Sequence, residues 1–188
     1  MLNYFDESKF SGFDPRDGFF AEKALKGHYN GAAKLHMTWV RAGDPDQDKQ
    51  RRSVFSENWK NWRACLDASV SKTEKTAFHY LLRKPDDFLG FLYEIPKETL
   101  ILYFESYQAF LWNKTLRKLA ETGPPEESFK KLKIPLLSQT AQMPDPALEK
   151  IWREILSEEK IGKEMFYTTK FKKIRFHPRE RAAAKDHC

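Results

Sequence analysis

The chain has 188 residues, of which 40% are hydrophobic and 14% aromatic, and its formal net charge is +6. This composition excludes a disordered or fibrous protein, and the length is sufficient for one domain, or two small ones, with a hydrophobic core. The two cysteines match no zinc spacing, the apolar run at 99–104 is too short to cross a bilayer, and the first ten residues lack a signal-peptide pattern, so we expect a cytoplasmic protein without membrane partners.

The first third of the chain predicts two helices and a loop. A helix is expected over 14–27, because Asp14 and Pro15 are residues that open helices and Gly27 is one that ends them. A second helix is expected over 30–40. The polar run at 41–53 contains Gly and Pro and lacks an apolar period, so it predicts a loop and a domain boundary.

The middle of the chain predicts four helices. Apolar residues recur at helical spacing in 56–68, 72–82 and 85–93, and each segment begins with a Pro, Ser or Thr signal. A longer helix is entered at Pro96 and includes 104–119.

The last third combines one helix with a strand. A turn is expected at 123–128, and a helix at 144–156 that places five apolar side chains on one face: Leu148, Ile151, Trp152, Ile155 and Leu156. Alternation at 172–178 predicts a strand with one basic face, and 2–5 is a candidate for the other strand. The expected fold class is α+β and predominantly helical.

Gln108 occupies an unusual place in the long helix. At about 100° per residue, Phe104, Leu111 and Leu119 form an apolar stripe, and Gln108 falls near its centre, whereas Asn113 falls on the opposite side. A buried amide left without partners costs roughly 1–3 kcal/mol. Most buried side-chain amides bond to backbone, so we expect Gln108 to support the fold by bonding to the backbone of a loop, and contact with a ligand is the alternative.

Positive charge concentrates at 170–181. This run could follow a phosphate backbone, and the alternative is a solvated basic tail. The candidates for phosphate contact are Lys170, Lys172, Lys173 and Arg175.

Common catalytic signatures are missing from the sequence. It contains no GxGxxG, P-loop, GxSxG or HExxH motif, and its five histidines are scattered, so we predict no metal and no cofactor. The segment "NYFDESKF" at 3–10 combines Asn, aromatic residues and Lys, a mixture that can stack on an unpaired base and contact phosphate. The alternative is that these aromatic residues belong to the core.

Two motifs in this order resemble one family. "NYFDESKF" resembles the N-Y-F-G-x-Q-R-F-G motif of the TruD family of tRNA pseudouridine synthases, and "SYQAFLWNKTL" at 106–116 resembles its A-Y-Q-S-Y-L-F-N segment. The similarity extends over about 3–178. It implies isomerisation of a tRNA uridine, in the family uridine thirteen, to pseudouridine without a cofactor, with tRNA as the partner.

The resemblance also implies a domain organisation. Residues 1–42 would be part of a divided catalytic domain, 43–165 the inserted, mainly helical domain of the family, and 166–188 a basic return strand and tail. The residues that would line the RNA-binding or active site are Asn3, Phe5, Lys9, Phe10, Gln108 and Asn113. The resemblance also implies that Gln108 fixes a loop or motif backbone near Asn3 by hydrogen bonds.

No catalytic residue is predicted. The family's catalytic aspartate belongs to a G-x-K-D-[RK] segment that precedes N-Y-F, and this chain begins two residues before Asn3. We therefore expect a truncated family member, and no conversion of uridine by the 188-residue chain alone. Two alternatives remain open: a non-catalytic RNA-binding module, and a helical protein-interaction domain in which Gln108 is a core amide.

Overall fold

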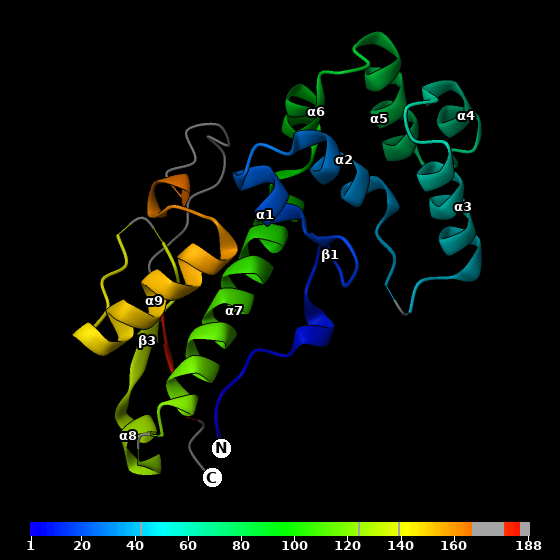
Figure 1. Cartoon of the computed structure of the whole chain (residues 1–188). Helices are drawn as coiled ribbons and strands as arrows, with labels where there is room; N and C mark the ends of the chain where they lie inside the picture. The colour runs from blue at the N-terminus through cyan, green and yellow to red at the C-terminus, as the bar shows by residue number, and fades with distance from the viewer. Residues whose placement is uncertain (42, 124, 139, 167–178, 185–188) are drawn as a thin grey trace. The chain divides into compact units, whose positions relative to one another are not determined.

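The computed structural model describes the chain except residues 42, 124, 139, 167–178 and 185–188, and the side chains of Lys9 and Glu126 (Figure 1). The described residues form nine α-helices and four short strands, which confirms the predominantly helical α+β class. The strand predicted at 172–178 lies outside the described residues.

Packing divides the chain into two compact units. Unit 1 comprises Met1–Phe10 and Phe104–Cys188, and unit 2 comprises Ser11–Tyr103. The longest helix, α7 (Lys97–Glu121), contributes residues to both units. This division by packing does not test the expected bounds 1–42, 43–165 and 166–188, which stay a prediction.

Unit 2 begins with a hairpin in place of the first half of the helix predicted over 14–27. Strands β1 (Phe13–Asp14) and β2 (Gly18–Phe19) pair antiparallel before α1 (Phe20–Leu25). The carboxylate of Asp14 accepts from the Arg16 amide at 2.8 Å, and Gly18 has φ 83°. These are features of a tight turn, so the prediction was wrong here because Asp and Pro also open turns.

The loop predicted over 41–53 is also partly wrong. Helix α2 (Tyr29–Thr38) ends as expected, but α3 (Asp46–Glu57) begins directly after Pro45. Acidic residues in its first turn favour the helix through its dipole. Phe55 is the only buried residue of α3, all of which is described, so its sequence shows no apolar period.

The single helix expected over 56–68 is divided. The backbone leaves the helical conformation after α3, where Lys60 has φ 80°, and α4 (Trp62–Asp67) starts anew. Asn61 caps α4 by accepting from the Ala64 amide at 3.3 Å.

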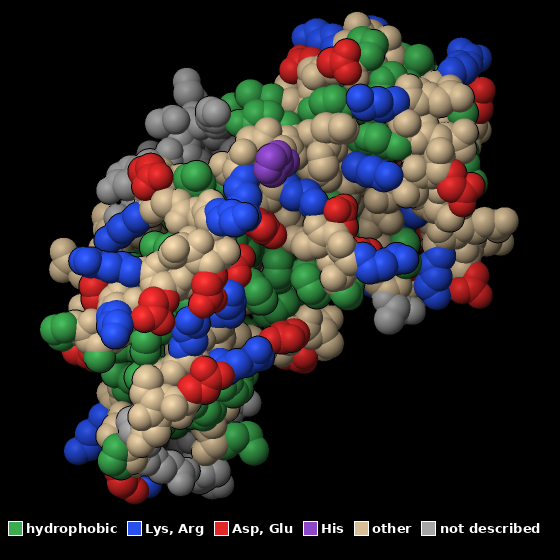
Figure 2. All heavy atoms as spheres, in the orientation of Figure 1, with side chains coloured by type: hydrophobic (Ala, Val, Ile, Leu, Met, Phe, Trp, Pro, Cys, Tyr) green, Lys and Arg blue, Asp and Glu red, His purple; other side chains and the backbone are tan. Residues whose placement is uncertain are grey.

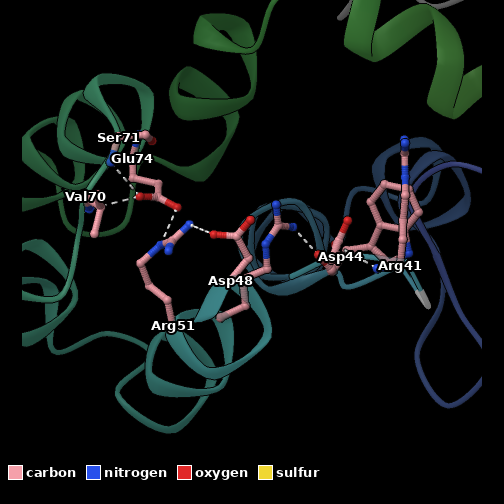
Figure 3. A network of polar contacts seen from close by, with 9 residues as sticks. Arg41, Asp44, Asp48, Arg51, Val70, Ser71 and Glu74 are labelled. Carbon is pink, nitrogen blue, oxygen red and sulfur yellow. Dashed lines mark hydrogen bonds and ion pairs between the residues drawn. The ribbon is translucent and has the colours of Figure 1, made fainter. Parts of the chain in front are cut away.

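Helix α5 (Lys72–Arg83) confirms the prediction over 72–82, and a polar network links it to α3 (Figure 3). Glu74 and Ser71 form a reciprocal capping box, and Glu74 also accepts from Arg51 Nε at 2.9 Å. Arg51 in turn donates to Asp48 at 2.6 Å. Although burial alone would raise the pKa of Glu74, the bonds from Ser71 and Arg51 hold it below its usual value.

Helix α6 (Phe88–Glu94) and the start of α7 complete unit 2 around a polar pair in an aromatic setting. His36 Nδ1 lies 2.9 Å from the hydroxyl of Tyr103, and Phe20 and Phe91 pack around His36 with ring centroids 6.4 and 6.1 Å away. Burial, with a smaller effect of Arg52, lowers the pKa of His36 to about 4. The neutral imidazole is therefore the form that this core accepts.

Unit 1 is built on α7, with α8 (Glu126–Lys131) and α9 (Pro146–Glu159). Strand β3 (Lys133–Pro135) pairs antiparallel with β4 (Glu180–Ala182), and Leu2 forms an isolated bridge with Ala184. Short 3-10 turns, η1 (Glu7–Lys9) and η2 (Lys163–Phe166), complete the order. One cluster of buried residues in unit 1 comprises Trp112, Leu116, Phe129, Ile134, Leu148 and Ala183.

Helix α9 confirms the prediction over 144–156. The apolar face is buried at Leu148, Ile151, Trp152 and Ile155, and Leu156 is half-buried. Its other face meets α7 through ion pairs: Lys114 lies 2.7 Å from Glu159, and Lys118 lies 2.6 Å from Glu158. Figure 2 shows basic and acidic side chains interleaved over this region. In the described part of the chain, no helix combines the length and apolarity needed to cross a membrane.

Candidate functional site

The N-Y-F residues of the first motif lie in an extended segment beside the described C-terminal residues. The backbone N–H of Asn3 donates to the Ala183 carbonyl at 2.9 Å, and the side-chain Nδ2 of Asn3 donates to the Ala182 carbonyl at 3.0 Å. Asp6, which stands where the family motif has glycine, caps η1 by accepting from the backbone and hydroxyl of Ser8 at 3.0 and 2.6 Å. The substitution therefore has a local structural role.

Asn113 fixes the backbone of Phe5. The Phe5 amide donates to Asn113 Oδ1 at 2.8 Å, and Asn113 Nδ2 donates to the Phe5 carbonyl at 3.0 Å. Asn113 is only 2% exposed, so both sides of α7 are buried in unit 1. One buried side chain thus satisfies both backbone groups of the motif phenylalanine.

Gln108 bonds to a different segment. Its Nε2 donates to the carbonyl of Leu137, in the loop after β3, and the side chain is 5% exposed. This is the kind of partner predicted, a loop carbonyl reached from inside the apolar stripe. The structure brings Asn113, not Gln108, to the motif backbone.

Replacing Gln108 with Leu separates a supporting role from ligand contact. We expect the free energy of unfolding to fall by roughly 1–3 kcal/mol, because the Leu137 carbonyl would lose its partner. Urea denaturation with a parallel tRNA titration measures both quantities. Equal or higher stability with weaker RNA binding would instead indicate direct contact with RNA.

Arg181, from β4, is the residue of this site that the sequence did not single out. Its Nε donates to the Asn3 carbonyl at 3.0 Å and its Nη2 to Asn3 Oδ1 at 2.8 Å. Its guanidinium carbon lies 3.9 Å from the centroid of the Phe5 ring. Burial lowers the pKa of Arg181. In sequence Arg181 was one cation of the basic run, and no local signal distinguished it.

The remaining predicted site residues are distributed differently. Phe10 is 9% exposed at the end of η1, where its amide donates to the Glu7 carbonyl at 3.1 Å. Lys9 belongs to η1, and its side chain lies outside the described part. The predicted phosphate contacts lie outside it as well: Lys170, Lys172, Lys173 and Arg175.

The chain that carries these two motifs and the extended N-Y-F segment is similar to known proteins. The family model described as tRNA pseudouridine synthase D (TruD) matches residues 1–131. The chain belongs to the TruD family. This match includes N-Y-F and the segment of α7 that carries Gln108 and Asn113.

Individual TruD proteins agree with this assignment. A probable tRNA pseudouridine synthase D of Methanococcus maripaludis is 25% identical over 94% of this chain and 52% of its own length. The tRNA pseudouridine synthase D of Leptospira interrogans is 28% identical over 63% of this chain and 30% of its own.

A solved structure supports the TruD fold. The chain aligns with a protein of Methanosarcina mazei described as a TruD, with a TM-score of 0.77 and 16% identity, over 97% of this chain and 51% of that one. The chain thus spans about half the length of the first of these relatives, and less of the second.

Proposed function

We propose that this chain contributes the N-Y-F surface of a tRNA pseudouridine synthase, an enzyme that isomerises one tRNA uridine, in the family uridine thirteen, to pseudouridine. One observation carries the proposal: in this TruD chain, Asn113 and Arg181 hold the N-Y-F motif in one conformation by hydrogen bonds to Phe5 and Asn3. A site that recognises one base benefits from groups that are fixed before the ligand arrives.

The proposed reaction explains why such a surface is needed. The bond from ribose C1′ to uracil N1 is broken, the base turns, and C1′ bonds to C5. C5 loses its proton and N1 gains one, so the product is an isomer, and the nucleotide must leave the helical stack for this exchange. A flipped base needs an aromatic face and amide hydrogen bonds. Phe5 supplies the face. Among the described residues, the Asn3 amide retains one N–H and one lone pair beyond its bonds to Ala182 and Arg181.

The test uses the product of the complete reading frame that contains this chain, together with unmodified tRNA transcripts. The 188-residue chain alone, from which we expect no conversion, serves as the comparison. Pseudouridine is detected by carbodiimide adduct formation and primer extension, for the unaltered protein and for Asn3→Ala and Phe5→Ala. We expect pseudouridine at one tRNA position and a loss of roughly 100-fold or more in each variant, because the base would no longer be oriented. Arg153→Ala serves as the control, since Arg153 is exposed on α9 and pairs only with Glu149 among the described residues. Binding of tRNA without conversion would favour the non-catalytic RNA-binding module, and absence of both would favour the protein-interaction domain.

Binding of tRNA is expected to depend steeply on salt. Each phosphate neutralised by Lys or Arg releases condensed counterions, so replacing Lys172, Lys173 and Arg175 with Ala should reduce the slope of log K against log salt by about 2–3. The matched control removes the same charge elsewhere, at Lys130, Lys150 and Arg153. Affinity that does not vary with salt, or no binding at low salt, would argue against RNA as the partner.

A further inference from the structure

We propose that Arg181 is a positioning residue of the base-binding site: it sets the orientation of the Asn3 amide and covers one face of Phe5, which leaves the opposite face for the flipped base. This inference rests on the proposed function. It adds a residue from the C-terminal part of the chain to a site that the sequence placed in the N-terminal motif and α7.

The first step is the geometry at Asn3. Arg181 Nε donates to the Asn3 carbonyl at 3.0 Å, and Nη2 donates to Asn3 Oδ1 at 2.8 Å and to the Tyr4 carbonyl at 3.4 Å. A guanidinium only donates, so the amide oxygen of Asn3 must face it, while Nδ2 faces the Ala182 carbonyl at 3.0 Å. Arg181 therefore determines which way the Asn3 side-chain amide points. If the amide were reversed, its Nδ2 would face the Arg181 donor and its Oδ1 would face the Ala182 carbonyl oxygen.

The second step is the geometry at Phe5. A carbon 3.9 Å from a ring centroid lies over the ring face, because the ring's own edge atoms prevent so close an approach from the side. The Trp112 ring centroid lies 5.5 Å from the Phe5 centroid, and the Trp112 ring is also 5.5 Å from the guanidinium carbon of Arg181. These equal distances place Trp112 beside the stack of Phe5 and Arg181. Its plane is at 89° to that of Phe5. Phe5 is half-buried against the hydrophobic cluster that contains Trp112, and neither Arg181 nor Trp112 lies over its second face.

The third step concerns charge. The three hydrogen bonds of Arg181 go to neutral oxygens, and no ion pair joins it to a carboxylate in the described ranges. Arg179, two residues earlier, is exposed and pairs with Glu105 at 3.4 Å. The planar guanidinium of Arg181 donates to several oxygens at once and so orients them. A Lys ammonium does not reproduce this geometry.

The experiment measures recognition of the base separately from recognition of phosphate. The probes are an oligouridylate and an abasic oligonucleotide of the same length and charge, and the base contribution is the ratio of their dissociation constants. The variants are Arg181→Met and Arg181→Lys, with Arg179→Met as the control that removes equal charge from the same segment. Near-UV circular dichroism and urea denaturation confirm that each variant is folded under the binding conditions.

We expect the unaltered protein to bind oligouridylate roughly tenfold more tightly than the abasic probe, as base stacking on an aromatic residue allows. Both Arg181 variants should bring the ratio close to one, and Arg179→Met should weaken both probes equally and preserve the ratio. The inference is overturned if the Arg181 variants keep the ratio, either with weaker binding of both probes, which indicates a phosphate contact, or with lower stability alone, which indicates a structural role. No base-dependent binding by the unaltered protein would instead contradict the proposed function.

A measurement on the unaltered protein keeps the inference testable if the Arg181 variants do not fold. The Arg181 Nε–H bonds to the Asn3 carbonyl and the guanidinium lies over the Phe5 ring, so its nuclear magnetic resonance signal reports on both contacts. We expect this signal to shift when oligouridylate is added and to stay in place with the abasic probe. A signal that responds identically to the two probes would overturn the inference.

Discussion

Replacing Asn113 with Leu is expected to lower the free energy of unfolding of unit 1 by on the order of 2–4 kcal/mol, because two backbone groups of Phe5 would lose their partners. The same change should weaken binding of oligouridylate, since the Phe5 ring would no longer be held in one place. Urea denaturation followed by tryptophan fluorescence, to which Trp112 beside Phe5 contributes as one of five tryptophans, measures the first effect.

Thr115→Val is the matched control for this prediction. Thr115 is 1% exposed on the same helix. Among the described residues its hydroxyl bonds only to the Leu111 carbonyl of α7, so removal of the hydroxyl leaves no group of another segment without a hydrogen-bond partner. We expect a change of less than about 1 kcal/mol. Equal losses for both variants would show that burial of a polar group, and not its contact with the motif, determines the effect of Asn113.

Acidification from pH 6.5 to pH 4 should destabilise unit 2 by roughly 3 kcal/mol through His36 alone, since each unit of pKa shift corresponds to about 1.4 kcal/mol. The folded pKa of about 4 lies below the ordinary histidine pKa of 6.5, so between these values the unfolded chain binds more protons than the folded one. Stability therefore falls as pH decreases through this window, is unaffected by His36 above it, and changes no further through His36 below it.

Urea denaturation at several pH values, compared with His36→Gln, isolates this contribution. Gln can still bond to the Tyr103 hydroxyl but does not titrate, so the variant should show a flat profile between pH 6.5 and about 4.5. Glu74 and Asp87, whose pKa values are lowered, lose their contributions only at lower pH. The same slope in both proteins would show that another group titrates in the window.

The elements that the sequence predicted well are those with local signals. α5 has a capping box at Ser71 and Glu74, and α9 has a Pro entry and a continuous apolar face. Such signals lie within a few residues of the helix that they specify. By contrast, α3 is polar over most of its length and is linked to α5 by Arg51, a contact that no local pattern shows.

The candidate site was predicted in part for the same reason. The sequence identified Asn3, Phe5 and Asn113 through two motifs, but it could not show that Asn113 bonds to the Phe5 backbone, a contact between residues 108 positions apart. From the sequence, Gln108 was expected to be the amide that bonds to the motif backbone. The apolar stripe of one helix does not reveal which side of that helix meets the motif. Arg181 could be found only from the folded chain, since its partner Asn3 is 178 positions away.

These long separations have a consequence for the order of folding. Unit 2 is one continuous segment, Ser11–Tyr103, whereas unit 1 joins residues on both sides of it. Contacts between distant residues form slowly because closing a long loop costs entropy before the contact stabilises it. During synthesis from the N-terminus, unit 2 can fold once its own residues have emerged, while Asn3 must wait for Arg181 and Ala183. The N-Y-F segment is thus among the last parts to take its final form, and a partly made chain cannot present the completed N-Y-F surface.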